Sequence, residues 1–395
     1  MAPGSPGGER VSSVEGLLLA EGALVAGRID CEGGLIAGLE LAECSALAPG
    51  APLVAPGLVD LHVHGFGGAD PLTDLAGMAR ALARAGTTAF QPTLFPAAPQ
   101  RLGAHCAGVH AAAAGLGEGA ARVLGLHLEG PFVNPRRAGA LPVEALAAPS
   151  PEGLRAILGP ATDGGRGVRT VTLAPELPGA GELIGELARS GVRVSLGHSL
   201  ATGSEARTAV AAGAAGVTHL YNAMGGVHHR NSGLANVALV EDVLSVEIIG
   251  DLVHVGPEAL DLALRARGPR GLCLVSDALR GAGTGCDVFH WHGRDHEIRD
   301  GAAYYPARGD GEPARLAGSA LSQLEMVRRL VARGVVGVED ALTMASEAPA
   351  RALGLEDDLG RLRIGGRADL LLLDAADLAL REVWIGGEPL AAPRG

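Results

Sequence analysis

The chain has 395 residues, of which 47% are hydrophobic and 19% charged, and this balance argues against a mainly disordered polypeptide. The formal net charge is −12 and no basic cluster is present, which argues against a nucleic-acid-binding protein because an acidic surface repels polyanions. We therefore expect a globular enzyme, large enough for one catalytic domain and a small accessory domain.

Other features of composition limit the cellular setting and the chemistry. The N-terminus lacks the charged and apolar segments of a signal peptide, and no run of about 18 apolar residues occurs, so we expect neither export nor a membrane span. The five cysteines are widely spaced without a CxxC pair, which favours a reducing cytoplasm.

All 32 basic residues are arginine, because the sequence contains no lysine. A Schiff-base lysine and a carboxylated lysine bridging two metal ions are therefore excluded.

The two ends of the chain have the pattern of short strands. Residues 11–55 contain apolar segments interrupted by glycine, with the alternation typical of strands. The stretch that begins at Gly365, GGRADLLLLDAADLALREVWIGGEPL, has a similar pattern with Gly-Gly turns. We predict that residues 1–55 and 361–395 pair into one small β-sandwich domain.

Residues 56–360 alternate apolar runs with alanine-rich helical stretches, as βα units do. Eight runs are present: GLVDLHVH, TTAFQPTL, RVLGLHLEG, RTVTLAPE, VRVSLGHS, GVTHLYNAM, LSVEIIGDLVH and GLCLVSDA. They predict an α/β fold with a closed (β/α)₈ TIM-type barrel, in which catalytic residues lie at the C-terminal ends of the strands. A doubly wound open sheet gives the same alternation. Histidines and carboxylates at the ends of the runs favour the barrel.

His62 and His64 end the first run and are candidate metal ligands. Alternate residues of a strand point to the same face, so both imidazoles can reach one ion. The glycines at 65, 67 and 68 allow a tight turn and a close approach of the backbone to a ligand. A pair of core or surface histidines is the alternative.

Glu129 ends the third run, where an unpaired carboxylate among apolar residues would be costly. Metal ligation would remove that cost, and an ion pair with Arg136 or Arg137 is the alternative. His127 alternates onto the same face as Glu129 and is a candidate supporting partner of a ligand.

His198 and His219 end two successive strands, one βα unit apart. Together with Glu129 they supply one carboxylate and two imidazoles, a known arrangement for a catalytic zinc ion. Satisfied core histidines are the alternative. Asp277 follows the very apolar run GLCLV, where a carboxylate can move a proton between water and a leaving amine, although Asp also caps helices.

The chain resembles the N-acetylglucosamine-6-phosphate deacetylases, a family within the amidohydrolase superfamily. The resemblance extends nearly from end to end and rests on motifs in the same order and spacing. They are PGLVDLHVHGFGG at 56–68, HLEGPFVNP at 127–135, GHS at 197–199, HLYNAM at 219–224, HHR at 228–230, DLVHV at 251–255, SDA at 276–278, LAGSAL at 316–321, PARALGL at 349–355 and GRLRIGGRADLLLLD at 360–374.

The resemblance implies a role for each matched position. The principal divalent ion, zinc or iron in this family, would be bound by Glu129, His198 and His219. A second ion would be bound, or the first supported, by His62 and His64, and Asp277 would be the general base and acid. The positions that hold a small amino-sugar phosphate would be Asn222, Ala223, Arg230, His254, Leu316, Ala317 and Gly318. The family equivalent of Arg230 reaches the site from a second subunit, which implies a homodimer.

One segment departs from the family pattern. Ala140 and Leu141 stand where family members have a histidine that contacts the acetamido group, and leucine donates no hydrogen bond. Loss of such a contact costs about 2.7 to 4 kcal/mol of transition-state stabilisation. The main expectation is hydrolysis of N-acetylglucosamine 6-phosphate to glucosamine 6-phosphate and acetate. The alternatives are a related amidohydrolase for another N-acyl amino sugar or phosphosugar, or a weakly active sugar-phosphate-binding paralogue.

Overall fold

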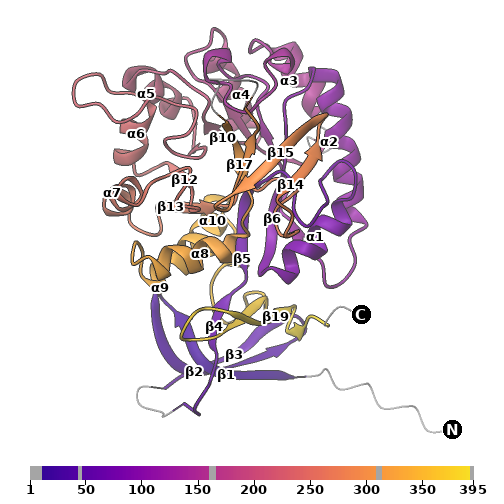
Figure 1. Ribbon diagram of the computed structural model, residues 1–395, viewed down its shortest axis with the longest axis vertical. Helices are drawn as coiled ribbons and strands as arrows, with labels where there is room; N and C mark the ends of the chain where they lie inside the picture. Colours follow the sequence, from indigo (N-terminus) through magenta and orange to yellow (C-terminus); the bar gives the residue numbers. More distant parts are fainter. Residues whose placement is uncertain (1–10, 43–46, 160–165, 308–313, 392–395) are drawn as a thin grey trace, which may run out of the picture.

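The computed structural model describes residues 11–42, 47–159, 166–307 and 314–391. Figure 1 shows a barrel with surrounding helices in the upper part of the molecule and a separate curved sheet below it. The chain passes from the lower sheet into the barrel through Gly57, which lies between β4 (Leu53–Pro56) and β5 (Leu58–Val63). A Cβ atom at Gly57 would overlap the side chain of Thr88, so only glycine fits this crossing.

The barrel consists of eight parallel strands in the order β5-β6-β8-β9-β10-β11-β12-β13, with the short strand β7 beside β6. A parallel bridge between Val63 and Ala278 joins the two ends of this order. The strands are β5, β6 (Thr87–Leu94), β7 (Arg122–Val123), β8 (Leu126–Glu129), β9 (Val168–Leu173), β10 (Arg193–Leu196), β11 (Gly216–Val217), β12 (Ser245–Ile249) and β13 (Leu272–Val275). They fall in the eight predicted runs, which confirms the barrel and not the open sheet.

Helices pack against the strands through apolar stripes. In α1, Leu75, Met78 and Leu82 recur at helical spacing and are buried, and the carboxylate of Asp74 caps the helix by accepting from the backbone N–H of Gly77 at 2.8 Å. The helices are α1 (Leu75–Arg84), α2 (Pro99–Ala114), α3 (Pro151–Leu158), α4 (Ala180–Arg189), α5 (Gly203–Ala211), α6 (Leu234–Val240), α7 (Pro257–Arg267), α8 (Gln323–Ala332), α9 (Val338–Ala345) and α10 (Glu347–Ala352), with 3₁₀ turns at Pro135–Arg137 and Val143–Ala145. Among the described helices, none has the length and apolar character needed to cross a membrane.

The lower sheet combines strands from both ends of the chain, as predicted. Its order is β20-β19-β18-β4-β1-β2-β3. The strands other than β4 are β1 (Ser12–Ala20), β2 (Ala23–Glu32), β3 (Leu35–Leu41), β18 (Leu370–Leu373), β19 (Leu380–Ile385) and β20 (Glu388–Pro389). The sheet curls around a core that includes Leu18, Ile29 and Trp384, and the backbone N–H of Ile36 donates to the carbonyl of Gly366 at 2.8 Å. The exact division of the chain at residues 55/56 and 360/361 stays a prediction.

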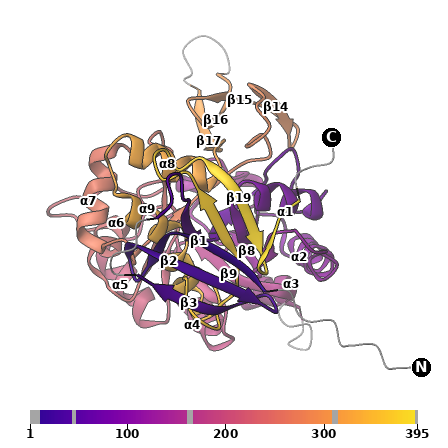
Figure 2. The same ribbon diagram turned by 90° about the horizontal axis from the view of Figure 1, so that it is seen from below.

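A four-stranded antiparallel sheet, separate from the lower sheet, was not predicted from the sequence. It contains β14 (Val288–Trp291), β15 (Arg294–Arg299), β16 (Ala302–Tyr305) and β17 (Arg315–Ser319), and Figure 2 shows it projecting from the barrel. Its two tight turns, His292-Gly293 and Asp300-Gly301, have positive φ at both residues, the conformation of a two-residue hairpin turn. The backbone N–H of Ser319 donates to the carbonyl of Asp277 at 2.9 Å, which attaches this sheet to the strand ends.

Candidate metal centre and substrate pocket

The predicted ligands converge at the end of the barrel that lies away from the lower sheet. His62 is in β5 and His64 follows that strand, while Glu129 is the last residue of β8. His198 and His219 follow β10 and β11, and all these side chains are at most 4% exposed. Closing the sheet into a barrel therefore brings together residues that are far apart in the sequence.

Glu129, His198 and His219 form the tightest group. The Nε2 atoms of His198 and His219 lie 2.9 and 3.0 Å from the same carboxylate oxygen, Oε1 of Glu129, and 3.1 Å from each other. The Nδ1–H of His198 donates to the carbonyl of Arg137 at 2.8 Å, which leaves the Nε2 lone pair free to bind an ion. In the described part of the chain Glu129 makes no ion pair with an arginine, contrary to the alternative drawn from the sequence.

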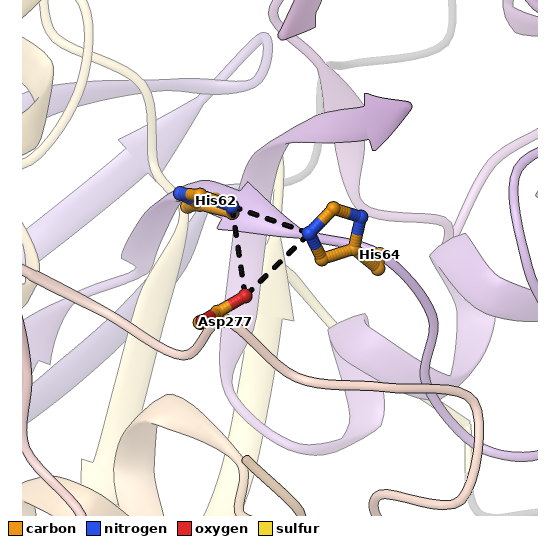
Figure 3. A group of neighbouring side chains, drawn as sticks. All are labelled: His62, His64 and Asp277. Atoms are coloured by element: carbon orange, nitrogen blue, oxygen red, sulfur yellow. Dashed lines mark hydrogen bonds and ion pairs between the residues drawn. The ribbon is translucent and has the colours of Figure 1, made fainter. Parts of the chain in front are cut away.

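His62, His64 and Asp277 form a second group beside the first, shown in Figure 3. The Nε2 atoms of the two histidines are 3.3 Å apart, and each lies 3.5 Å from Oδ1 of Asp277. Oε2 of Glu129 lies 3.2 Å from Nε2 of His64. Oε1 of Glu129 also lies 3.6 Å from Nε2 of His62, so this carboxylate contacts both groups.

Buried side chains behind His62 hold its ring in place. The Nδ1–H of His62 donates to Oε2 of Glu247 at 3.1 Å, and Glu247 is completely buried in β12. Asp60 accepts from the backbone N–H of His62 at 3.2 Å. Neither carboxylate was predicted from the sequence, although Glu247 lies in the apolar run SVEII and carries the same signal as Glu129.

His127, the candidate supporting residue, contacts His62. The two ring centroids are 4.6 Å apart. The Nδ1–H of His127 donates to the carbonyl of Leu61 at 3.1 Å, and its Nε2 accepts from the hydroxyl of Thr172 at 2.8 Å. Burial lowers the pKa of His127 to about 3, so its ring is neutral at physiological pH.

The electrostatics of the cluster suit both the binding of a cation and the transfer of a proton. Burial lowers the pKa of His62 well below its usual value, so this imidazole has a free lone pair. Burial acts to raise the pKa of Glu129, but the surrounding histidines hold it well below its ordinary range. Burial, followed by the negative charge of Glu129, raises the pKa of Asp277 well above the usual value, as a proton-accepting base requires.

The backbone at three of these positions is left-handed. His198, His219 and Asp277 have φ values of 48°, 31° and 46°, a conformation that non-glycine residues rarely adopt. Such conformations persist where the surrounding structure imposes them, and they cluster at functional sites. Here each one lies just beyond a barrel strand, where the chain leaves the sheet.

The donor set fits a divalent transition-metal ion. Several Nε2 lone pairs converge on one carboxylate in a buried site, whereas imidazoles without an ion would each require a separate hydrogen-bond partner. Imidazole nitrogen with carboxylate oxygen, and no sulfur, is typical of catalytic zinc and non-haem iron.

A pocket of about 200 Å³ opens over this cluster and brings the predicted substrate residues together. Besides the ligands and Asp277, its lining includes Ala140, Leu141, Asn222, Ala223, His254, Leu316, Ala317 and Gly318. The last three belong to β17, so the unpredicted sheet completes the wall. The ring of His254 is held by Asp251, with Nδ1 2.6 Å from the carboxylate.

Among the described residues that line the pocket, Arg230 is not present. It is exposed on the loop between Ala223 and α6, and its backbone N–H donates to Nδ1 of His228 at 3.1 Å. Arg230 thus lies outside the pocket lining of its own chain.

Leu141 stands where the related family has a histidine, and in this structure it is an apolar core residue. It is 4% exposed and packs with Val133 and Ala138. The side chain contributes no hydrogen-bond donor to the pocket, as the sequence indicated.

Comparison with known proteins agrees with this geometry. A model of the amidohydrolase family matches residues 53–390, and the chain belongs to this family. It is 34% identical over 376 residues to the N-acetylgalactosamine-6-phosphate deacetylase of Escherichia coli O157:H7, covering 94% of this chain and 97% of that protein. It is 36% identical over 362 residues to the N-acetylglucosamine-6-phosphate deacetylase of Homo sapiens, covering 86% of this chain and 83% of that protein.

Solved structures show the same fold. A mutant N-acetyl-D-glucosamine-6-phosphate deacetylase from Mycobacterium smegmatis, in complex with N-acetyl-D-glucosamine 6-phosphate, superimposes with a TM-score of 0.86 at 31% identity and covers 97% of this chain and 100% of that one. The corresponding enzyme from Thermotoga maritima gives a TM-score of 0.82 at 28% identity, over 96% of this chain and 99% of that one.

Proposed function

We propose that this protein is a metal-dependent deacetylase that hydrolyses N-acetylglucosamine 6-phosphate to glucosamine 6-phosphate and acetate. The observation that carries the proposal is the convergence of Glu129, His198, His219 and Asp277 at the base of one pocket. The choice of substrate is supported by relatives in sequence and in structure that are N-acetylglucosamine-6-phosphate deacetylases.

Two ions are proposed for the centre. Glu129, His198 and His219 would hold the first, and His62, His64 and Asp277 the second, with zinc or iron as the expected metal. The carboxylate of Glu129 contacts both groups and would be available as a ligand to either ion, a role that a carboxylated lysine cannot have in this lysine-free chain. When bound, such ions polarise the scissile carbonyl and lower the pKa of water.

Asp277 is proposed to move the proton. Its carboxylate lies 3.5 Å from the imidazoles of His62 and His64 and lines the pocket, so it can reach a water molecule there. Its raised pKa favours uptake of a proton from the attacking water, and the same proton can then pass to the nitrogen of the leaving amine.

The sugar phosphate is proposed to lie across Asn222, Ala223 and His254, with the β17 residues Leu316, Ala317 and Gly318 along the sugar. Arg230 of the partner subunit would complete the phosphate site in a homodimer, because Arg230 does not line the pocket of its own chain. A cytoplasmic setting is also proposed. It is supported by Cys31, Cys106, Cys273 and Cys286, which are free thiols.

The C4 epimer of the sugar is a second candidate substrate. It is favoured by the 34% identity to a protein named N-acetylgalactosamine-6-phosphate deacetylase, which extends over 94% of this chain. Both 6-phosphates therefore belong in the same assay.

Acetate release from the two phosphosugars tests the proposal. The purified protein is assayed with zinc, iron or manganese, and again after chelation. Asp277→Asn serves as the variant, and it is expected to lose about 10²-fold to 10⁴-fold in kcat/KM because the amide accepts no proton. Absence of acetate release from either sugar with every metal would refute the proposed function.

A further inference from the structure

A second, larger cavity adjoins the substrate pocket and is not used by the proposed reaction. Its volume is about 500 Å³, within the range of small-molecule sites. The two cavities share His64, Phe95 and Ala140 in their walls. The rings of His64 and Phe95 are stacked, with centroids 3.9 Å apart, so the shared wall is built directly on a candidate metal ligand.

The larger cavity and the proposed phosphate end lie on opposite sides of the metal centre. The cavity is formed by the segments after β5, β6 and β8, by Leu279 beyond β13, and by β14, β15 and β16 of the sheet that projects in Figure 2. Asn222 follows β11, which lies four strands from β6 around the closed barrel, whereas His254 follows β12, which only β13 separates from β5. A substrate whose phosphate lies beside Asn222 and whose amide lies at the metal centre therefore has its acyl group on the side of the larger cavity.

The inner wall of this cavity is apolar and aromatic. Leu94, Leu279 and Trp291 are at most 6% exposed, and Phe95 and Tyr305 pack against the same cluster. These residues present the kind of surface that binds a hydrocarbon group.

Two buried polar groups of the wall, Asp70 and His296, are bonded or neutral. The carboxylate of Asp70 accepts from the hydroxyl of Thr73 at 2.7 Å and from the indole N–H of Trp291 at 3.3 Å. Burial lowers the pKa of His296, so its ring is uncharged at neutral pH. Five further titratable residues of the lining are less buried than these two groups: Arg101, His105, Glu144, His292 and Arg294.

We propose that this cavity holds an N-acyl group larger than acetyl, with an apolar body of about four to six carbons. The inference rests on the proposed function and extends its substrate class. The reaction is the same amide hydrolysis: the water oxygen bonds to the acyl carbon, the carbon–nitrogen bond breaks, the amine takes the proton, and the acyl group leaves as a carboxylate. Leu141 lines the substrate pocket and belongs to an apolar cluster against which Phe95 packs, so it matches such a group better than a polar residue does.

The test compares kcat/KM for glucosamine 6-phosphate carrying N-acetyl, N-butyryl, N-hexanoyl or N-succinyl groups. Each methylene buried in the cavity is expected to increase kcat/KM by up to about fourfold. The wild type should therefore hydrolyse the butyryl and hexanoyl substrates at least as efficiently as the acetyl substrate.

Filling the cavity should reverse this preference. Ala97→Trp, in the loop that leads to α2, is expected to lower the butyryl-to-acetyl ratio about tenfold or more. The matched control is Ala114→Trp at the other end of α2, about 24 Å along the helix axis, which should keep the wild-type ratio. Ala145→Trp places the same side chain on another wall and replaces Ala97→Trp if that variant does not fold, as judged by its thermal melt.

Each outcome has a defined meaning. A lower kcat/KM for both the butyryl and the hexanoyl substrate than for the acetyl substrate overturns the acyl cavity, and the proposed deacetylase activity is then retained. Equal ratios in the Ala97→Trp and Ala114→Trp variants also overturn it. Preference for succinyl over butyryl overturns the apolar assignment. Absence of hydrolysis of every substrate overturns the proposed function as well.

Discussion

Glu247 is expected to control the affinity of the metal ion that His62 holds. Glu247 is completely buried, and its Oε2 accepts from the Nδ1–H of His62 at 3.1 Å. This charged acceptor fixes the imidazole tautomer with Nε2 free and increases the basicity of the ring. Glu247→Gln keeps the size and an accepting oxygen but removes the charge.

The magnitude follows from this contact. Loss of a partner behind a ligating histidine weakens metal binding about 10-fold to 100-fold, or about 1.4 to 2.7 kcal/mol. Glutamine still accepts one hydrogen bond, so we expect the lower end, about tenfold. The ion at Glu129, His198 and His219 should bind as in the wild type, because Glu247 forms no hydrogen bond with those residues in the described structure.

Competition between the metal-free protein and a chromophoric chelator for Zn²⁺ measures both affinities. Glu258→Gln, at an exposed position of α7, is the matched control and should leave the titration unchanged. A Glu247→Gln protein that folds and binds both ions within twofold of the wild-type Kd would refute the reasoning.

Three further predictions concern the substrate, the fold and the metal. Leu141→His restores a donor beside the scissile amide and should increase kcat/KM for the acetyl substrate by up to about 10²-fold, measured by acetate release; no gain would show that the donor is not limiting. Burial raises the pKa of Asp369 above its usual 3.8, so the stability that this carboxyl contributes is complete below pH 3.8 and is lost as the pH rises through the folded-state pKa. Asp369→Asn keeps an acceptor for Gly386 and should raise Tm at pH 7 to 8 but not below pH 4; an equal shift at both pH values would contradict this. Zinc at about one hundred times its Kd should increase the free energy of unfolding of the metal-free protein by about 2.7 kcal/mol. An unchanged thermal melt would contradict a metal site.

The barrel could be predicted because each strand and helix leaves a local pattern in the sequence. The eight apolar runs became the eight strands, and the histidines and carboxylates that end them lie at one end of the barrel. The β14–β17 sheet was missed although its turns His292-Gly293 and Asp300-Gly301 are local signals. Its strands are partly exposed and carry polar residues, so they lack the continuous apolar character of the barrel strands.

The sequence by itself determined the fold class and the chemical types at the site, because periodicity, strand-end position and the absence of lysine are properties of the chain. Only the tertiary structure decided which atoms meet. It directed one oxygen of Glu129 toward His198 and His219 and the other toward His64, and it placed Glu247 behind His62. The larger cavity likewise depends on barrel closure, because its walls come from β5, β6 and the β14–β17 sheet, which are distant in sequence. Contacts of this kind depend on the curvature and register of the whole sheet, which no local stretch of sequence specifies.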